Sequence, residues 1–143
     1  MNCYALNNIE FPSCTFLGES VFFNCALSSV SFELLTEIPL DTFSQINTLT
    51  TAYFPKCQII GTSAFYNCQS LSIINFNACE EIKPYAFEFC LNLSNIILSQ
   101  CLKIGRNAFL GCENLSIIDL SLCSEIGSHC FQKCSNLQTI NLP

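Results

Sequence analysis

The sequence predicts an α/β solenoid, a right-handed superhelix with a parallel β-sheet on its concave face and short helices on its convex face. Cysteines recur with a constant step of 11 residues from Cys57 to Cys134. The residues that follow alternate cysteines differ, so the true repeat unit is twice as long as this step. A period of roughly 20 to 50 residues is typical of solenoids, in which each unit buries its apolar side against its neighbours.

Four apolar columns follow the 22-residue period along the chain. The first is Phe22, Phe43, Phe65, Phe87, Phe109 and Phe131. The second is Leu6, Leu27, Leu49, Leu71, Leu93, Leu115 and Leu137. The third is Ile9, Val30, Ala52, Ile74, Ile96, Ile118 and Ile140, and the fourth is Phe11, Phe32, Phe54, Phe76, Leu98, Leu120 and Leu142. One residue is missing between Cys25 and Leu27, after which the register recovers.

Each unit carries one strand signal and one helix signal. The segment 73–76 alternates around its apolar positions and is rich in β-branched and aromatic residues, which favours a short strand. The segment 63–68 follows a glycine and begins with Ser63, whose equivalents Ser20, Asp41 and Asn107 are also residue types that cap helices. One strand and one short helix per unit are therefore expected.

A helical alternative exists, because an 11-residue apolar repeat can also produce a right-handed helical supercoil. Pro39, Pro55 and Pro84 recur within the pattern and would break long helices. The stacked α/β coil is the favoured interpretation.

Both halves of the unit resemble a known family. The strand half, L-x-x-I-x-F-x-x-C at 71–79, is similar to the leucine-rich repeat signature. The other half, I-G-x-x-A-F-x-x-C-x-x-L at 60–71 and 104–115, resembles the BspA-type leucine-rich repeat. The resemblance covers nearly the whole chain and implies surface proteins of bacteria or protists that adhere to host cells or matrix and bind proteins. Ile46 and Leu35 replace cysteines of the pattern, as structural columns tolerate.

The regular cysteines are interpreted as packing residues, because a small buried thiol packs as a hydrophobe and donates weakly to a nearby carbonyl. Disulfides between stacked coils are possible by distance, but equivalent side chains point in parallel, which fits the disulfide dihedral poorly. Zinc needs converging ligands, and the one close pair is Cys130 and Cys134 beside His129. A catalytic cysteine would need that same histidine as its base. We therefore expect no metal, no cofactor and no catalytic residue.

Composition limits the partners. The chain has 143 residues with 50% hydrophobic and 11% charged residues, and its net charge is −6. Its five Lys and Arg residues are scattered, so a nucleic-acid partner is not expected. No apolar run approaches the ~20 residues of a membrane-spanning helix. The start of the sequence, MNCYALNNIEFPSC, lacks the basic and apolar regions of a signal peptide.

The outward strand positions are the candidate binding site, and none of them is Lys or Arg. On adjacent coils they present an apolar stripe with a polar rim, which is typical of a protein-binding face. The alternative is that β-branched residues simply suit a strand. The candidate site on the concave face comprises Tyr53, Ile73, Asn75, Ile97, Ile117 and Asp119.

Function and location follow as expectations. The preferred function is a non-enzymatic protein-binding module, plausible as a cell-surface or secreted adhesin. The alternative is a cytoplasmic structural or scaffold component held in a larger assembly by end-to-end or lateral packing. Two sequons, at Asn92 and Asn114, occupy equivalent repeat positions, and repetition alone explains both.

The domain prediction is a single leucine-rich repeat domain over residues 1–143, of about six and a half 22-residue units. The chain begins and stops inside a repeat, and neither end offers the polar capping unit that free solenoids use. The sequence therefore predicts a fragment of a longer array, or a chain that self-associates end to end.

Overall fold

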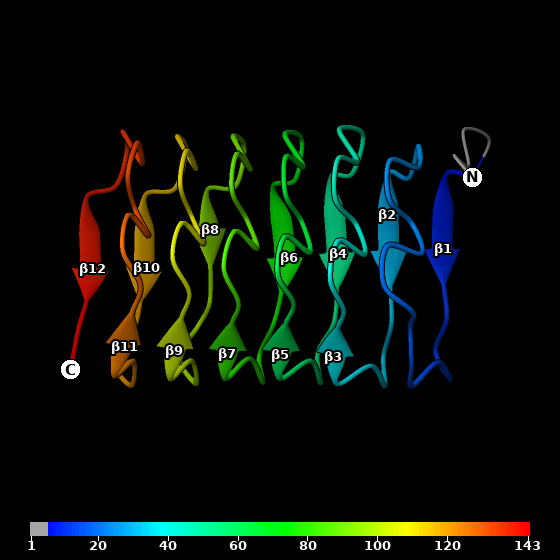
Figure 1. Cartoon of the computed structure of the whole chain (residues 1–143), viewed down its shortest axis with the longest axis horizontal. Helices are drawn as coiled ribbons and strands as arrows, with labels where there is room; N and C mark the ends of the chain where they lie inside the picture. The colour runs from blue at the N-terminus through cyan, green and yellow to red at the C-terminus, as the bar shows by residue number, and fades with distance from the viewer. Residues whose placement is uncertain (1–5) are drawn as a thin grey trace.

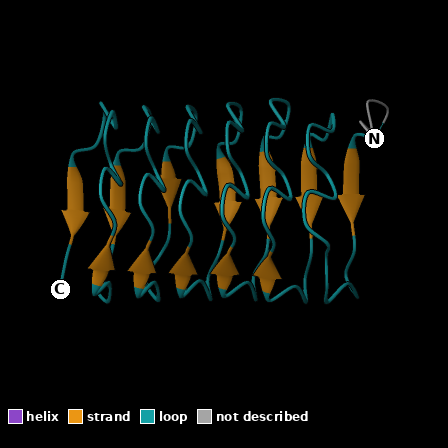
Figure 2. Ribbon diagram, viewed as in Figure 1, coloured by secondary structure: helices purple, strands orange, loops and turns teal. Residues whose placement is uncertain are grey.

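A computed structural model describes residues 6–143 as a stack of similar coils, each contributing short parallel strands (Figures 1 and 2). One side of the stack, the long-strand ladder, contains β1 (Asn8–Glu10), β2 (Ser29–Ser31), β4 (Thr51–Tyr53), β6 (Ile73–Asn75), β8 (Asn95–Ile96), β10 (Ile117–Asp119) and β12 (Thr139–Asn141). A second side, the short-strand ladder, contains β3 (Glu37–Ile38), β5 (Ile59–Ile60), β7 (Glu81–Ile82), β9 (Lys103–Ile104) and β11 (Glu125–Ile126). The solenoid class and the parallel long-strand ladder are confirmed.

The strand register follows the sequence repeat. Ile60 pairs with Ile82 and Ile82 pairs with Ile104, each one full repeat further along the chain. The pairing of Ile9 with Val30 spans one residue fewer, which confirms the one-residue deletion near Cys25. Hydrogen bonding divides the long-strand ladder into β1-β2-β4-β6 and β8-β10-β12, although β6 and β8 remain adjacent (Figure 1).

The expected helices on the convex face are wrong, because residues 6–143 contain no helix. The segment 63–68 and its equivalents are turns. Ser63 and Asn67 have φ of 54° and 57°, and both left-handed positions recur in every equivalent turn. Asn, Asp and Ser suit helix caps, but they also tolerate the left-handed region or turn locally, so the same residue types predicted the wrong structure.

This turn side is held together by hydrogen bonds between coils, which a helix would make within itself. The N–H of Phe65 donates to the carbonyl of Ala86 at 2.8 Å, and the N–H of Phe87 donates to that of Ala108 at 2.8 Å. Ser63 and Asn67 donate to the next coil in the same way. Left-handed residues turn alternate N–H groups toward one end of the stack, so the backbone is satisfied without a helix.

The core consists of two stacked columns of phenylalanine rings. Phe65 and Phe87 are fully buried, with ring centroids 5.4 Å apart and planes inclined by 3°. The second column places Phe54 and Phe76 5.7 Å apart, and Phe65 contacts Phe76 edge-on at 6.0 Å. Leucine, isoleucine and cysteine columns complete the interior, so the predicted apolar columns are confirmed as core along the inner coils.

Backbones of adjacent coils lie close together beside the short-strand ladder. A Cβ added at Gly61 would lie 2.4 Å from the carbonyl oxygen of Ile38, which requires glycine at this position. The equivalent Gly105 would meet the backbone of Pro84 at 2.4 Å. Among residues 6–143, no helix has the length and apolar character needed to cross a membrane.

Candidate protein-binding face

The predicted stripe residues point outward from the long-strand ladder. Ile73 and Ile97 expose 63% and 64% of their surface, whereas their strand neighbours Ile74 and Ile96 are buried. Ile117 is 52% exposed and Tyr53 is 42% exposed. The alternation of a β-strand produces this division, because successive side chains point to opposite faces.

The outward residues form two rows that run across the strands. Strand pairing places Thr51 beside Ile73 and Tyr53 beside Asn75, and it places Asn95 beside Ile117. Extending the 22-residue register across β6 and β8 gives a first row and a second row. The first row is Thr51, Ile73, Asn95 and Ile117, and the second row is Tyr53, Asn75, Ile97 and Asp119.

Apolar and polar residues alternate within each row, with the two rows offset by one coil. Tyr53, Ile73, Ile97 and Ile117 therefore form a zigzag, with one apolar side chain on each successive coil. We call the eight residues of the two rows the zigzag face. The predicted apolar stripe is exposed on this surface, but as a checkerboard and not as a continuous line.

Two polar residues of the zigzag face have defined surroundings. The side-chain oxygen Oδ1 of Asn75 is buried and has no hydrogen-bond partner among the described residues. Asp119 accepts a hydrogen bond from the backbone N–H of Ser121 at 3.2 Å. Both side chains are partly exposed, so each can still meet a partner laid over the face.

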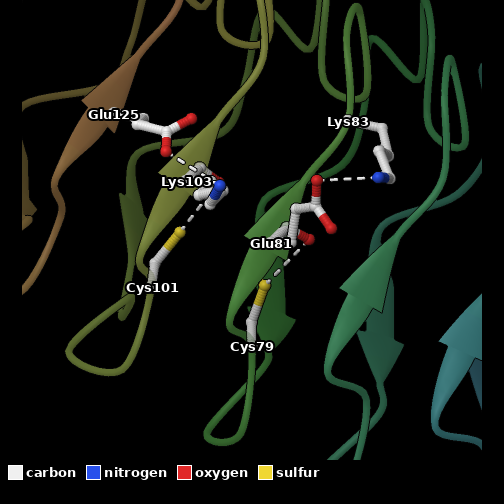
Figure 3. A network of polar contacts seen from close by, with 6 residues as sticks. All are labelled: Cys79, Glu81, Lys83, Cys101, Lys103 and Glu125. Atoms are coloured by element: carbon white, nitrogen blue, oxygen red, sulfur yellow. Dashed lines mark hydrogen bonds and ion pairs between the residues drawn. The ribbon is translucent and has the colours of Figure 1, made fainter.

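Two cationic side chains lie on or beside the short-strand ladder, and the long-strand ladder has none at its outward positions. Lys103 Nζ lies 2.8 Å from Glu125 Oε1 on the neighbouring strand, and Lys83 Nζ lies 2.7 Å from Glu81 Oε1 (Figure 3). The hydrogen bond and charge of Glu125 raise the pKa of Lys103. These pairs were not predicted, because strands of two residues give too little pattern in the sequence to recognise.

The two cysteine columns use their thiols differently. Cys90 Sγ donates to the carbonyl of Phe65 in the preceding coil at 3.1 Å, and Cys112 donates equivalently to Phe87. Cys101 instead donates to Lys103 within its own coil at 3.4 Å (Figure 3). The predicted S–H donation to a neighbouring coil is confirmed for one cysteine column, at Cys68, Cys90, Cys112 and Cys134. Cys3 of that column lies outside the described residues.

The buried thiols of Cys68 and Cys79 are poor nucleophiles. No cysteine among residues 6–143 forms a disulfide, and burial raises the pKa of Cys68 to about 12. The hydrogen bond with Cys101 and burial together raise the pKa of Cys79. A thiolate is the reactive form, so these groups are held in the unreactive state.

The pair Cys130 and Cys134 is not part of a metal-ligand cluster. Across the part of the chain that the structure describes, no three His, Cys, Asp or Glu side chains converge to hold a metal ion. Cys130 is buried in the column that alanine fills at 64, 86 and 108, and burial raises its pKa to about 12. The packing interpretation therefore accounts for this cysteine.

The sequon asparagines belong to an exposed amide ladder that sequence reasoning missed. Asn114 Nδ2 donates to Asn92 Oδ1 at 3.2 Å, and Asn136 Nδ2 donates to Asn114 Oδ1 at 3.2 Å. The recurrence of asparagine at one position of successive repeats was the signal that could have revealed the ladder. Each amide links adjacent coils at the surface.

Family comparison agrees with this architecture. A model described as "BspA type Leucine rich repeat region (6 copies)" matches residues 1–78 and 36–143. The chain belongs to the BspA-type leucine-rich repeat family. The family match of this BspA-type chain covers the repeats that carry its phenylalanine and cysteine columns. Among curated proteins, none matches it.

Solved structures with the same fold come from bacteria. A leucine-rich repeat protein from Bacteroides ovatus matches with TM-score 0.85 and 31% identity over 95% of this chain and 37% of that one. The T. pallidum leucine-rich repeat protein matches with TM-score 0.75 and 26% identity over 79% of this chain and 57% of that one. A leucine-rich cell surface protein from Faecalibacterium prausnitzii shares the fold at TM-score 0.74 and 23% identity, covering 94% and 47%. The BspA-type chain spans less than two thirds of each protein's length.

Proposed function

We propose that the BspA-type chain is a non-enzymatic module that binds another protein through the zigzag face. The observation that carries the proposal is the regular exposure of Ile73, Ile97 and Ile117 on successive coils of one strand face. Exposed apolar residues with a polar rim are typical of protein interfaces. Leucine-rich repeat domains also typically bind proteins, and solenoids commonly use their extended strand surface for this purpose.

The finer part of the proposal is adhesion at a cell surface, with a host protein or matrix component as the partner. Family membership supports it, because BspA-type repeats typically occur in surface or secreted bacterial proteins. Labelling of the chain by antibody on intact cells from the natural source would test the location. Signal that requires permeabilised cells would contradict it.

A retention experiment tests the binding face. The triple variant Ile73→Asp, Ile97→Asp, Ile117→Asp is compared with the unchanged chain on a panel of immobilised matrix proteins and cell extracts. Each partner retained by the unchanged chain is expected to be lost by the triple variant, because three charges then replace the apolar anchors.

The matched control adds three aspartates elsewhere, at exposed apolar positions away from the zigzag face. Phe16, Leu102 and Leu122 are exposed by 80%, 43% and 51% and are suitable for substitution by Asp. This control is expected to keep its partners. Equal recovery by both triple variants would overturn the proposed face.

The alternative function is a structural component that packs end to end in a larger assembly. It is supported by the repeat architecture, in which each coil buries its apolar residues against neighbouring coils. Sedimentation of the 143-residue chain would then show association that grows with concentration and weakens when Leu142 is changed to Asp. A monomer at all concentrations would remove this alternative.

A further inference from the structure

The spacing of the apolar residues on the zigzag face specifies the shape of what can cover it. Tyr53, Ile73, Ile97 and Ile117 advance by one coil at each step and alternate between the two rows. Neighbouring strands lie about 4.8 Å apart, so these four anchors span about 14 Å along the stack. Residues two apart on one strand separate the rows by about 6.6 Å.

An α-helix laid along the stack matches this pattern. Its apolar positions i, i+3, i+7 and i+10 alternate between two sides of a seam, as in the a and d positions of a heptad. At 1.5 Å per residue they span about 15 Å, close to the span of the four anchors. An extended segment presents one face at every second residue, so four of its side chains span about 20 Å and lie in one line.

The polar residues of the rows complete the fit. Asn75 lies between Tyr53 and Ile97 in the second row, and Asn95 lies between Ile73 and Ile117 in the first. Alternating apolar and amide side chains leave staggered positions that the side chains of a helix can occupy, as knobs occupy holes in a coiled coil. A straight apolar line would offer no such alternation.

Charge selects among helices. Asp119 ends the second row, the outward long-strand positions carry no Lys or Arg, and the chain has a net charge of −6. Complementary potentials favour a partner with basic residues beside its apolar seam. We infer, building on the proposed binding function, that the partner of the zigzag face is a single amphipathic α-helix with a heptad-like apolar seam flanked by lysine or arginine, lying along the stacking axis.

Two peptides of identical composition test the inference. Both contain only leucine and lysine and are roughly 18 residues long, above the length below which isolated helices are marginal in water. One places leucine at heptad a and d positions, and the other places the same number of leucines at every second position. Titration calorimetry with the full 143-residue chain at physiological salt measures each affinity. The heptad peptide is expected to bind at least tenfold more tightly and to gain helical circular dichroism on binding.

A swap variant controls for apolar area and charge. The pair Ile73→Asn with Asn75→Ile keeps the composition but moves the apolar side chain into the second row, between Tyr53 and Ile97. We expect this swap to weaken the heptad peptide at least tenfold while the melting temperature stays within a few degrees. Should it fail to fold, the pair Ile117→Asp with Asp119→Ile breaks the zigzag in the same way at another coil.

The outcomes separate the inference from the proposed function. Equal or tighter binding of the alternating peptide would overturn the helix inference, and the binding function would stand if the triple aspartate variant abolished that binding. An affinity of the heptad peptide that stays unchanged in both swap variants would also overturn the inference. The absence of binding by either peptide would overturn it as well. The proposed function would then be decided by the retention experiment alone. A heptad peptide with glutamate in place of lysine that binds equally would contradict the charge requirement.

Discussion

Core side chains repeat along the molecule in columns, so one substitution disturbs the coils on both sides. Phe109 stacks on Phe87 at 5.3 Å and on Phe131 at 5.7 Å, and no part of it is exposed. Cysteine fills two further columns, where its small thiol can donate to a carbonyl in the same or the preceding coil. An apolar side chain at these positions is therefore a requirement of stacking.

Truncation of a core-column residue should lower the stability of the fold substantially. We expect Phe109→Ala to lower the free energy of unfolding by about 3–5 kcal/mol, because the cavity lies between two coils and neither can close it alone. Urea unfolding followed by circular dichroism measures the loss. Phe16→Ala, at a side chain that is 80% exposed, is the matched control and should change stability little. Equal effects of the two changes would contradict the core assignment.

The buried cysteine columns should make the stability of the fold decrease at alkaline pH. Burial raises the pKa of Cys68 from 9.0 to about 12, so the unfolded chain releases this proton at lower pH than the folded chain. Its contribution to stability is complete below pH 9 and is lost as pH rises toward 12, at up to about 1.4 kcal/mol per pH unit.

Unfolding free energies measured between pH 8 and about 11 test whether stability decreases as pH rises. Cys68→Ala removes one titrating thiol and should show a shallower decline with pH than the unchanged chain. A steeper or identical decline in the variant would contradict the assignment.

At the scale of the element, the turn side explains where sequence reasoning failed. Ser63, Asp41 and Asn107 were predicted as helix caps, yet all three adopt left-handed backbone. The local composition of a cap and of a left-handed turn is the same, and the deciding interaction is a hydrogen bond to the next coil of the stack. The short-strand ladder was missed for a related reason, because two-residue strands such as Glu81–Ile82 are defined only by their neighbours.

The left-handed turns should respond to substitution according to φ. Gly111 has φ of 74°, and a Cβ there would lie 2.6 Å from Cδ1 of Phe89, so Gly111→Ala should destabilise by about 1–2 kcal/mol or more. Gln45 is exposed with φ of 62°, and Gln45→Asn should stabilise by up to about 1 kcal/mol. Thermal unfolding of both variants tests the prediction. Turns that were helical would show the opposite order, since asparagine is the poorer helix former.

The short-strand ladder should depend on charge order. Lys103 lies between Glu81 and Glu125 on adjacent strands. Lys103→Glu would place three like charges side by side, and we expect a lower melting temperature, more so in low salt than in high salt. Lys103→Gln separates the loss of attraction from the added repulsion. A charge-reversed variant that melts like the glutamine variant at low salt would contradict the predicted repulsion.

At the scale of the whole molecule, the repeat determines the interior and leaves the surface free. The period, the apolar columns and the outward exposure of Ile73 and Ile97 could be predicted, because they depend only on alternation and on identical copies. The checkerboard of the zigzag face could have been read from the same register, but it becomes meaningful only once the pairing of Tyr53 with Asn75 fixes the rows. What binds there depends on residues outside the repeat consensus, and no periodicity encodes a partner.

The central claim is that coils are joined by hydrogen bonds on the turn side where helices were expected, and amide hydrogen exchange tests it most directly. Phe65, Phe87 and Phe109 donate their N–H groups to the next coil, whereas Phe131 in the equivalent turn has no such partner among the described residues. Residue-resolved exchange by NMR should find the first three strongly protected and Phe131 fast. Within a short helix all four N–H groups would lie in the first turn, where they lack intrahelical partners. Equally fast exchange at all four phenylalanines would therefore contradict the account.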